Sequence, residues 1–285
     1  MRKVLLATVI LLTLFSSIFS QGFFNIVSNG TPEEVQKAIE AGANVNDRDS
    51  IIGWTPLMYA ASNNQNPEVV AALIKAGANV NERDSDGLTP LMFAAGNNQN
   101  PEVVVALIQA GSNVNGRNSK GLTPLMIAAG DNQNPEVITT LIKAGAKVNE
   151  RFSDGATPLM LAAGNNQNPE VITTLIKAGA NVNDRTSLGG TPLMCAAGLN
   201  QNPEVITTLI KAGANVNERF SDGVTPLMAA AGYNQNPEVV TILLKSGADA
   251  KLKDDEGKTA FDCAKDNENI KGTTAYWELN DAQYK

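Results

Sequence analysis

Apolar and polar positions recur along this chain with a fixed period. The sequence Thr-Pro-Leu-Met occurs six times with a constant period of 34 in residue number, and a degenerate copy follows at Thr259. The copies begin at Thr55, Thr89, Thr123, Thr157, Thr191 and Thr225. A period between about 20 and 50 residues is typical of a solenoid, in which each unit buries its apolar face against its neighbours. The pattern therefore predicts one elongated domain with a long surface of equivalent positions.

Each unit contains the start and stop signals of two helices. Thr89 followed by Pro90 fits an N-cap and the first position of a short helix. Asn100 followed by Pro101 repeats this arrangement before apolar residues with i, i+3, i+4 spacing. Gly111 then fits a left-handed C-cap. The unit is therefore predicted to be a loop, a short helix, a turn and a longer helix.

The repeat resembles the ankyrin family over about residues 22 to 270. The family's Thr-Pro-Leu-His-x-Ala-Ala is present as Thr-Pro-Leu-Met-x-Ala-Ala, and its Gly-Ala-x-Val-Asn is present over residues 77–81. The resemblance implies an all-α solenoid of stacked helix-turn-helix units with projecting fingers. It also implies a concave binding face formed by the fingers and the first helices.

The chain departs from the family pattern in three ways. Each unit is longer by one residue than the usual ankyrin repeat, and the extra residue falls in the Asn-Gln-Asn-Pro turn between the helices. The loop over residues 47–54 is one residue longer than its counterparts. Methionine replaces the motif histidine in every full copy, at Met58, Met92, Met126, Met160, Met194 and Met228. We therefore expect the fingers to depend more on apolar packing than on a polar tie from this side chain.

Residues 1–20 have the three-part pattern of a secretory signal peptide. Arg2 and Lys3 precede an uncharged apolar stretch, and small residues precede an expected cut after Ser20. The alternative is an uncleaved membrane anchor, but the apolar stretch is shorter than the roughly 20 residues of a spanning helix. We therefore expect an exported, monomeric protein, periplasmic or secreted, that is not inserted in a membrane after cleavage.

The predicted domain organisation follows from these patterns. A signal peptide covers residues 1–20, and an ankyrin repeat domain of about seven units covers residues 21–285. Within this domain we expect an N-terminal cap over 21–54, regular repeats over 55–250 and a C-terminal cap over 251–285. Terminal repeats of a solenoid need a polar outer face, and Tyr276, Trp277 and Leu279 are expected to cover the last apolar seam.

Charge excludes some classes of partner. The chain has 22 basic and 29 acidic residues, a net charge of −7. Loss of residues 1–20, which hold two bases and no acid, would leave 20 − 29 = −9. Nucleic-acid binding normally needs a basic face, and docking on anionic lipid needs basic clusters. A nucleic-acid partner is therefore not expected.

Residues suited to catalysis or metal binding are scarce. The chain has no histidine, and Cys195 and Cys263 lie two full periods apart. They therefore occupy the same position in different units, too far apart for a disulfide. The recurring acids fall in turns and first helical turns, and the segment 84–87 lacks the later glutamate of a calcium loop. No catalytic, cofactor-binding or metal-binding residue is predicted.

Candidate contact residues are those at the fingers and at positions that vary between repeats. Arginines in the fingers could bind carboxylates of a partner or pair with neighbouring finger acids; those selected are Arg83, Arg117, Arg151, Arg185 and Arg219. The apolar candidates are Trp54, Phe152, Phe220, Leu199 and Tyr233. Exposed aromatics beside arginine have the composition of an interface hot spot, but each phenylalanine could instead fold back onto its neighbouring finger.

The most favoured function is a non-catalytic, exported module that binds a protein partner on its concave face. One alternative is a structural or protective envelope protein. Another is glycan binding through the recurring Asn-Gln-Asn segments, which would stack as amide rows. The structural interpretation of these segments, N-capping and hydrogen bonding between repeats, is favoured over the glycan interpretation.

Overall fold

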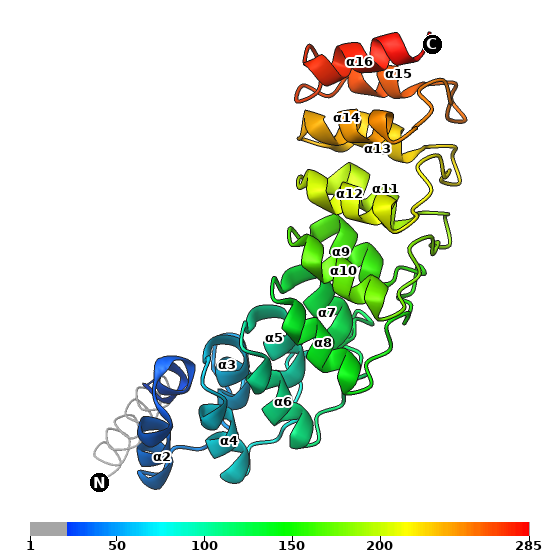
Figure 1. The fold of residues 1–285 in the computed structure, drawn as a ribbon. Helices are drawn as coiled ribbons and strands as arrows, with labels where there is room; N and C mark the ends of the chain where they lie inside the picture. The colour runs from blue at the N-terminus through cyan, green and yellow to red at the C-terminus, as the bar shows by residue number, and fades with distance from the viewer. Residues whose placement is uncertain (1–21, 285) are drawn as a thin grey trace, which may run out of the picture. The chain divides into compact units, whose positions relative to one another are not determined.

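The computed structural model describes residues 22–284, and within them every regular element is a helix. Residues 22–124 and 143–145 form one compact unit, and residues 125–142 and 146–284 form another. The predicted signal peptide lies outside the described residues. Helix pairs follow one another in each unit (Figure 1), which confirms the all-α solenoid of helix-turn-helix repeats.

The first unit begins with a helix over residues 22–29. It continues with α2 (Pro32–Glu40), α3 (Pro56–Asn63), α4 (Pro67–Lys75), α5 (Pro90–Asn97) and α6 (Pro101–Gln109). The second unit holds the remaining helices, except that the first residue of α7, Pro124, and the last residue of α8, Lys143, belong to the first unit. These are α7 (Pro124–Asp131), α8 (Pro135–Lys143), α9 (Pro158–Asn165), α10 (Pro169–Lys177), α11 (Pro192–Leu199), α12 (Pro203–Lys211), α13 (Pro226–Tyr233), α14 (Pro237–Lys245), α15 (Ala260–Ala264) and α16 (Thr274–Ala282).

The helix ends are set by the residues that the sequence indicates. The Thr191 hydroxyl accepts a hydrogen bond from the backbone N–H of Met194 at 3.3 Å and caps α11. Asn202 caps α12 by accepting from the N–H of Glu204 at 2.9 Å. After α12 the chain turns at Gly213, whose φ of +94° lies in the left-handed region. The predicted caps are therefore confirmed.

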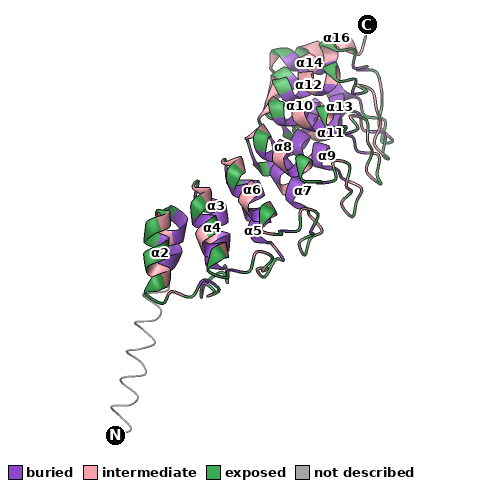
Figure 2. Cartoon of the chain, turned by 60° about the horizontal axis from the view of Figure 1, so that its bottom comes forward, coloured by how far each residue is buried: buried purple, intermediate pink, exposed green. Residues whose placement is uncertain are grey.

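The core of each repeat lies between its two helices and the helices of its neighbours. In α10 the apolar side chains Val171, Ile172 and Leu175 are fully buried, and in Figure 2 the outer faces of the second helices remain exposed. The first helices are buried almost throughout because their Ala-Ala-Gly segments allow close approach. All six motif methionines are buried as well, so they extend the apolar core in place of the family's histidine.

The first asparagine of each Asn-Gln-Asn segment ties one repeat to the one before it. The amide of Asn200, which is 0% exposed, donates to the carbonyl oxygens of Ala163 at 2.9 Å and Asn166 at 2.8 Å. Its own oxygen accepts from the N–H of Asn202 at 2.9 Å. One side chain therefore satisfies two buried carbonyl groups and one part-buried N–H group, which confirms the structural interpretation of these asparagines.

The C-terminal cap keeps this tie although its sequence has diverged. Asn267 donates to the carbonyl oxygens of Ala231 at 3.1 Å and Asn234 at 2.9 Å. In α16 Leu279 is buried, and Tyr276 packs on Phe261 with ring centroids 4.8 Å apart. The expectation that Trp277 also covers the last seam is wrong, because this side chain is 57% exposed.

Candidate binding surface

The fingers are the loops that join the second helix of one repeat to the first helix of the next. Each forms a tight turn, as between the N–H of Phe220 and the carbonyl of Val224 at 2.9 Å. Adjacent fingers are also hydrogen-bonded, for example from the N–H of Ser221 to the carbonyl of Leu188 at 2.9 Å. Within each unit the fingers therefore form a hydrogen-bonded layer beside the first helices, which restrains their backbone.

Within each unit, finger arginines join one finger to the next. Arg185 donates to the carbonyl of Arg219 at 3.0 Å and pairs with Glu218. Arg219 donates to the carbonyl of Lys253 at 2.7 Å. Arg83 and Arg151 make the same contact, to the carbonyls of Arg117 at 2.8 Å and Arg185 at 2.9 Å respectively. Of the two interpretations of this row, the geometry favours the structural one, because the guanidinium groups already have partners within the protein.

Replacing Arg185 with alanine tests this assignment. We expect the free energy of unfolding to fall by about 1 kcal/mol or less, because exposed ion pairs and hydrogen bonds contribute little. We also expect unchanged affinity for a partner. Urea unfolding followed by circular dichroism measures the first effect, and a binding titration measures the second. A large loss of affinity with unchanged stability would contradict the structural assignment.

Two of the predicted finger aromatics, Trp54 and Phe220, pack against neighbouring residues of their own unit. Trp54 lies against Phe93 and Tyr59, with ring centroids 4.2 Å and 5.3 Å away. Phe220 folds onto the preceding finger, where a Cβ added at Gly190 would lie 3.4 Å from its Cε2 atom. Phe152 is half-buried. Trp54 and Phe220 therefore have a packing role that their sequence position did not reveal.

Leu199 and Tyr233 differ from the finger aromatics because they are exposed to solvent. They end the neighbouring first helices α11 and α13, which pack against each other, and they are 66% and 76% exposed. The equivalent position in three other first helices is asparagine, at Asn63, Asn97 and Asn165. An asparagine therefore suffices for the fold at this position, and the fold does not explain a leucine or a tyrosine there.

Other exposed apolar residues were missed by the sequence analysis. Ile51, 84% exposed, and Ile52 lie at the turn of the first finger, and Leu188 lies at the turn of a later finger. The equivalent turn positions elsewhere are polar, for example Asp86 and Lys120. The sequence did contain a signal for these residues. The loop 47–54 has one extra residue, and Leu188 is an apolar residue at a turn position that is polar elsewhere.

A groove of about 330 Å³ adjoins Tyr233 in the second unit. Its apolar lining is Val224, Met228, Gly232 and Cys263, with the side chain of Tyr233. Its charged lining comes from two fingers and from α15 and the residues after it, and comprises Asp222, Asp254, Glu256, Lys258, Asp262 and Asp266. Gly232 and Cys263 lie next to each other in this lining, where a Cβ on Gly232 would lie 3.6 Å from that of Cys263.

Two of the groove's acids are neutralised by lysines of the chain. Asp262 accepts from Lys265 at 2.7 Å, and this bond, with those from Thr259, lowers the pKa of its carboxyl to about 2. Glu256 pairs with Lys258 at 2.7 Å, and this pair raises the pKa of the lysine. Among the described residues, Asp222 and Asp254 accept only from backbone N–H groups. Within the same part of the chain Asp266 makes no hydrogen bond or ion pair, so negative charge remains at the groove.

The comparisons with known proteins agree with this geometry. A family model described as ankyrin repeats (3 copies) matches at residues 23–118, 91–186, 165–254 and 193–273. The chain belongs to the ankyrin repeat family. The crystal structure of the human ASB11 ankyrin repeat domain is similar, with a TM-score of 0.69 and 27% identity over 80% of this chain and 97% of that one. No curated protein matches the sequence.

Ankyrin repeats are generally protein–protein interaction modules and typically are not catalysts. In this ankyrin repeat protein burial raises the pKa of the Cys195 thiol to about 11 and also raises that of Cys263. Both thiols are therefore poor nucleophiles at neutral pH. Among residues 22–284 no three histidine, cysteine or acidic side chains are placed to hold a metal ion, and no helix there is long and apolar enough to cross a membrane.

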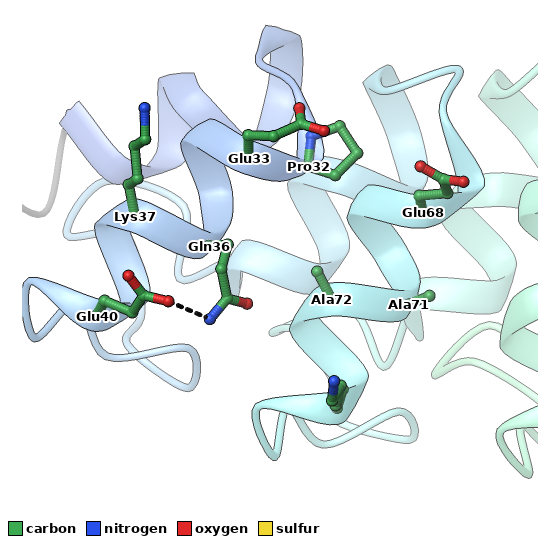
Figure 3. A pocket seen from close by; sticks show the side chains of 9 residues that line it. Pro32, Glu33, Gln36, Lys37, Glu40, Glu68, Ala71 and Ala72 are labelled. Carbon is green, nitrogen blue, oxygen red and sulfur yellow. Dashed lines mark hydrogen bonds between the residues drawn. The ribbon is translucent and has the colours of Figure 1, made fainter.

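A second groove, of about 540 Å³, lies between α2 and α4 in the first unit. Figure 3 shows Gln36 of α2 and Ala72 of α4 on facing sides of the two helices, with the Gln36 amide bonded to Glu40. Its charged lining is mixed, three glutamates and two lysines, and its described lining includes no exposed large apolar side chain. It lies on second helices, away from the fingers of the same repeats.

Proposed function

We propose that this ankyrin repeat protein is an exported, non-catalytic module that binds a protein partner on the finger and first-helix face of its second unit. Leu199 and Tyr233 are the proposed anchors. The observation that carries the proposal is their exposure at a position where neighbouring repeats have asparagine. Burying such side chains in a complex removes apolar area from water, and tyrosine is enriched among binding hot spots.

The rigidity of the surface supports the same proposal. Helix caps, buried asparagines and finger-to-finger hydrogen bonds hold the backbone around both anchors before any partner arrives. Binding to a preorganised surface costs little ordering entropy, so more of the contact energy becomes affinity. The finger arginines and Phe220 contribute to this proposal indirectly, because their internal contacts hold the fingers in place.

The two alternatives from the sequence are affected differently. Glycan binding cannot use the first asparagine of segments such as those at Asn200 and Asn234, because the amides of these residues already donate to backbone carbonyls. It would have to use the exposed glutamines, of which Gln201 already donates to Gln235 at 2.9 Å. The structural or protective role depends on where the protein resides. The proposed export is based on the pattern of residues 1–20, and detection of the protein in separate envelope and culture fractions would test it.

Affinity capture with residues 21–285 as bait tests the proposal. A second bait carries Leu199→Asn and Tyr233→Asn, which restore the residue of other repeats and so preserve the fold. We expect a protein enriched by the first bait from the envelope or culture fraction and lost with the second. Two hot-spot side chains together correspond to a loss of affinity of about 30-fold or more.

The matched control is Asn165→Ala, at the equivalent position of α9. This bait should recover the partner like the unchanged chain, because Asn165 is not a proposed anchor. Recovery of the same partner by the double variant would place the binding face elsewhere. Recovery of no protein by any bait would favour the glycan or structural alternative.

A further inference from the structure

We propose that the groove beside Tyr233 receives an arginine side chain from a basic segment of the protein partner. This inference rests on the proposed function and adds the chemistry of the partner. The groove combines an exposed aromatic ring, an apolar floor and a rim of carboxylates within one cavity of about 330 Å³. Each of these matches a different part of an arginine side chain.

The apolar floor suits the aliphatic stem of the arginine. Val224, Met228 and Gly232 line the groove, and Met228 is almost fully buried beneath the surface. Long basic side chains bury their methylene groups along apolar surfaces while the charged end stays near water. A short acidic or hydroxyl side chain would leave this floor uncovered.

The carboxylates suit the guanidinium group. Five acids and one lysine line the groove. Lys265 pairs with Asp262 and Lys258 pairs with Glu256. Within the described residues, the groove carboxylates without a lysine partner are those of Asp222, Asp254 and Asp266. Carboxylates bind a guanidinium through two parallel hydrogen bonds, and this planar group also stacks on an aromatic ring such as that of Tyr233. The acids are not grouped as metal ligands within the described residues, so a larger organic cation fits better than a metal ion.

Lys258 is the competitor for this position within the chain itself. Its ammonium group lies in the rim and pairs with Glu256 at 2.7 Å. The residue at the equivalent place in the preceding repeat is Val224, so Lys258→Val keeps a side chain that the repeat accepts. Removing the lysine would free Glu256 for the partner's arginine, and affinity should rise.

Titration of fluorescein-labelled peptides into residues 21–285 tests the inference through fluorescence anisotropy. The probe is a short peptide that alternates arginine and leucine, and its counterpart has glutamate in place of arginine. We expect binding of the arginine peptide alone. Asp222→Asn with Asp266→Asn should weaken it about fivefold or more, and Lys258→Val should strengthen it about threefold.

The control variant carries Glu40→Gln and Glu68→Gln, which remove the same charge from the groove between α2 and α4. It should change the affinity by less than about twofold, because general attraction between a basic peptide and an acidic protein is screened by salt. Equal weakening by both double variants, no effect of Lys258→Val, or no binding of the arginine peptide would overturn the inference.

The failure of this inference can be told apart from the failure of the proposed function. One outcome is that the Leu199→Asn, Tyr233→Asn bait loses the captured partner while the Asp222→Asn, Asp266→Asn bait recovers it fully. This outcome would support the proposed binding function and refute the basic segment of the partner. Both proposals would be supported if both double-variant baits lost the partner while the control variants, Asn165→Ala and Glu40→Gln with Glu68→Gln, retained it.

Discussion

Replacing Asn200 with alanine is expected to lower the free energy of unfolding by about 3 kcal/mol, because two buried backbone groups and one part-buried group lose their partner. The side chain is fully buried, donates to the carbonyls of Ala163 and Asn166, and accepts from the N–H of Asn202. Each unsatisfied buried group costs about 1–3 kcal/mol, reduced where water can enter. Urea unfolding monitored by circular dichroism would measure the change.

The neighbouring residue provides the control for this measurement. Gln201→Ala removes an exposed bond to Gln235 and is expected to change stability by less than about 0.5 kcal/mol. Similar losses for Asn200→Ala and Gln201→Ala would show that the buried asparagine does not link the repeats as described.

The second large effect is expected from Leu209→Ala in α12. Leu209 is 0% exposed, and truncation of a buried leucine costs about 2–5 kcal/mol through lost burial and the cavity that remains. Because each repeat contacts only its neighbours, the damage should concentrate around α12 and the helices that pack on it, α10, α11 and α14. Urea unfolding gives the magnitude, and amide hydrogen exchange locates the loss of protection.

Thr208→Ala is the matched control on the same helix. Thr208 is half-buried, so its truncation leaves no comparable cavity and should cost less than about 0.5 kcal/mol. Uniform loss of protection across all described repeats in Leu209→Ala would contradict the local coupling.

The repeat architecture could be predicted from the sequence because its signals are local and occur many times. Thr-Pro and Asn-Pro place an N-cap before a residue with a helical φ, and a glycine supplies the left-handed turn after the second helix. These preferences act within a few residues and need no tertiary information. The role of Asn200 was also accessible, since an amide repeated at the period of the fold can bond to its neighbour's backbone.

Side-chain direction could not be predicted in the fingers. Phe220 and Leu199 are both apolar residues at positions that vary between repeats, and each touches a glycine of the preceding repeat, yet the first is half-buried and the second is 66% exposed. Which of these occurs depends on the space left by the adjacent repeat. Arg185 was equally ambiguous, because its choice between a partner and the carbonyl of Arg219 depends on the spacing between fingers.

The sequence alone determined the period, the helix pairs and their caps, because these follow from local residue preferences repeated in register. The tertiary structure alone decided which candidates are available for binding. It gave the finger arginines bonding partners within the protein, packed Phe220 against the preceding finger, left Leu199 and Tyr233 exposed, and formed a groove beside Tyr233. Exposure and cavities depend on atoms that lie a whole repeat apart in the chain and pack side by side, and no local pattern contains that information.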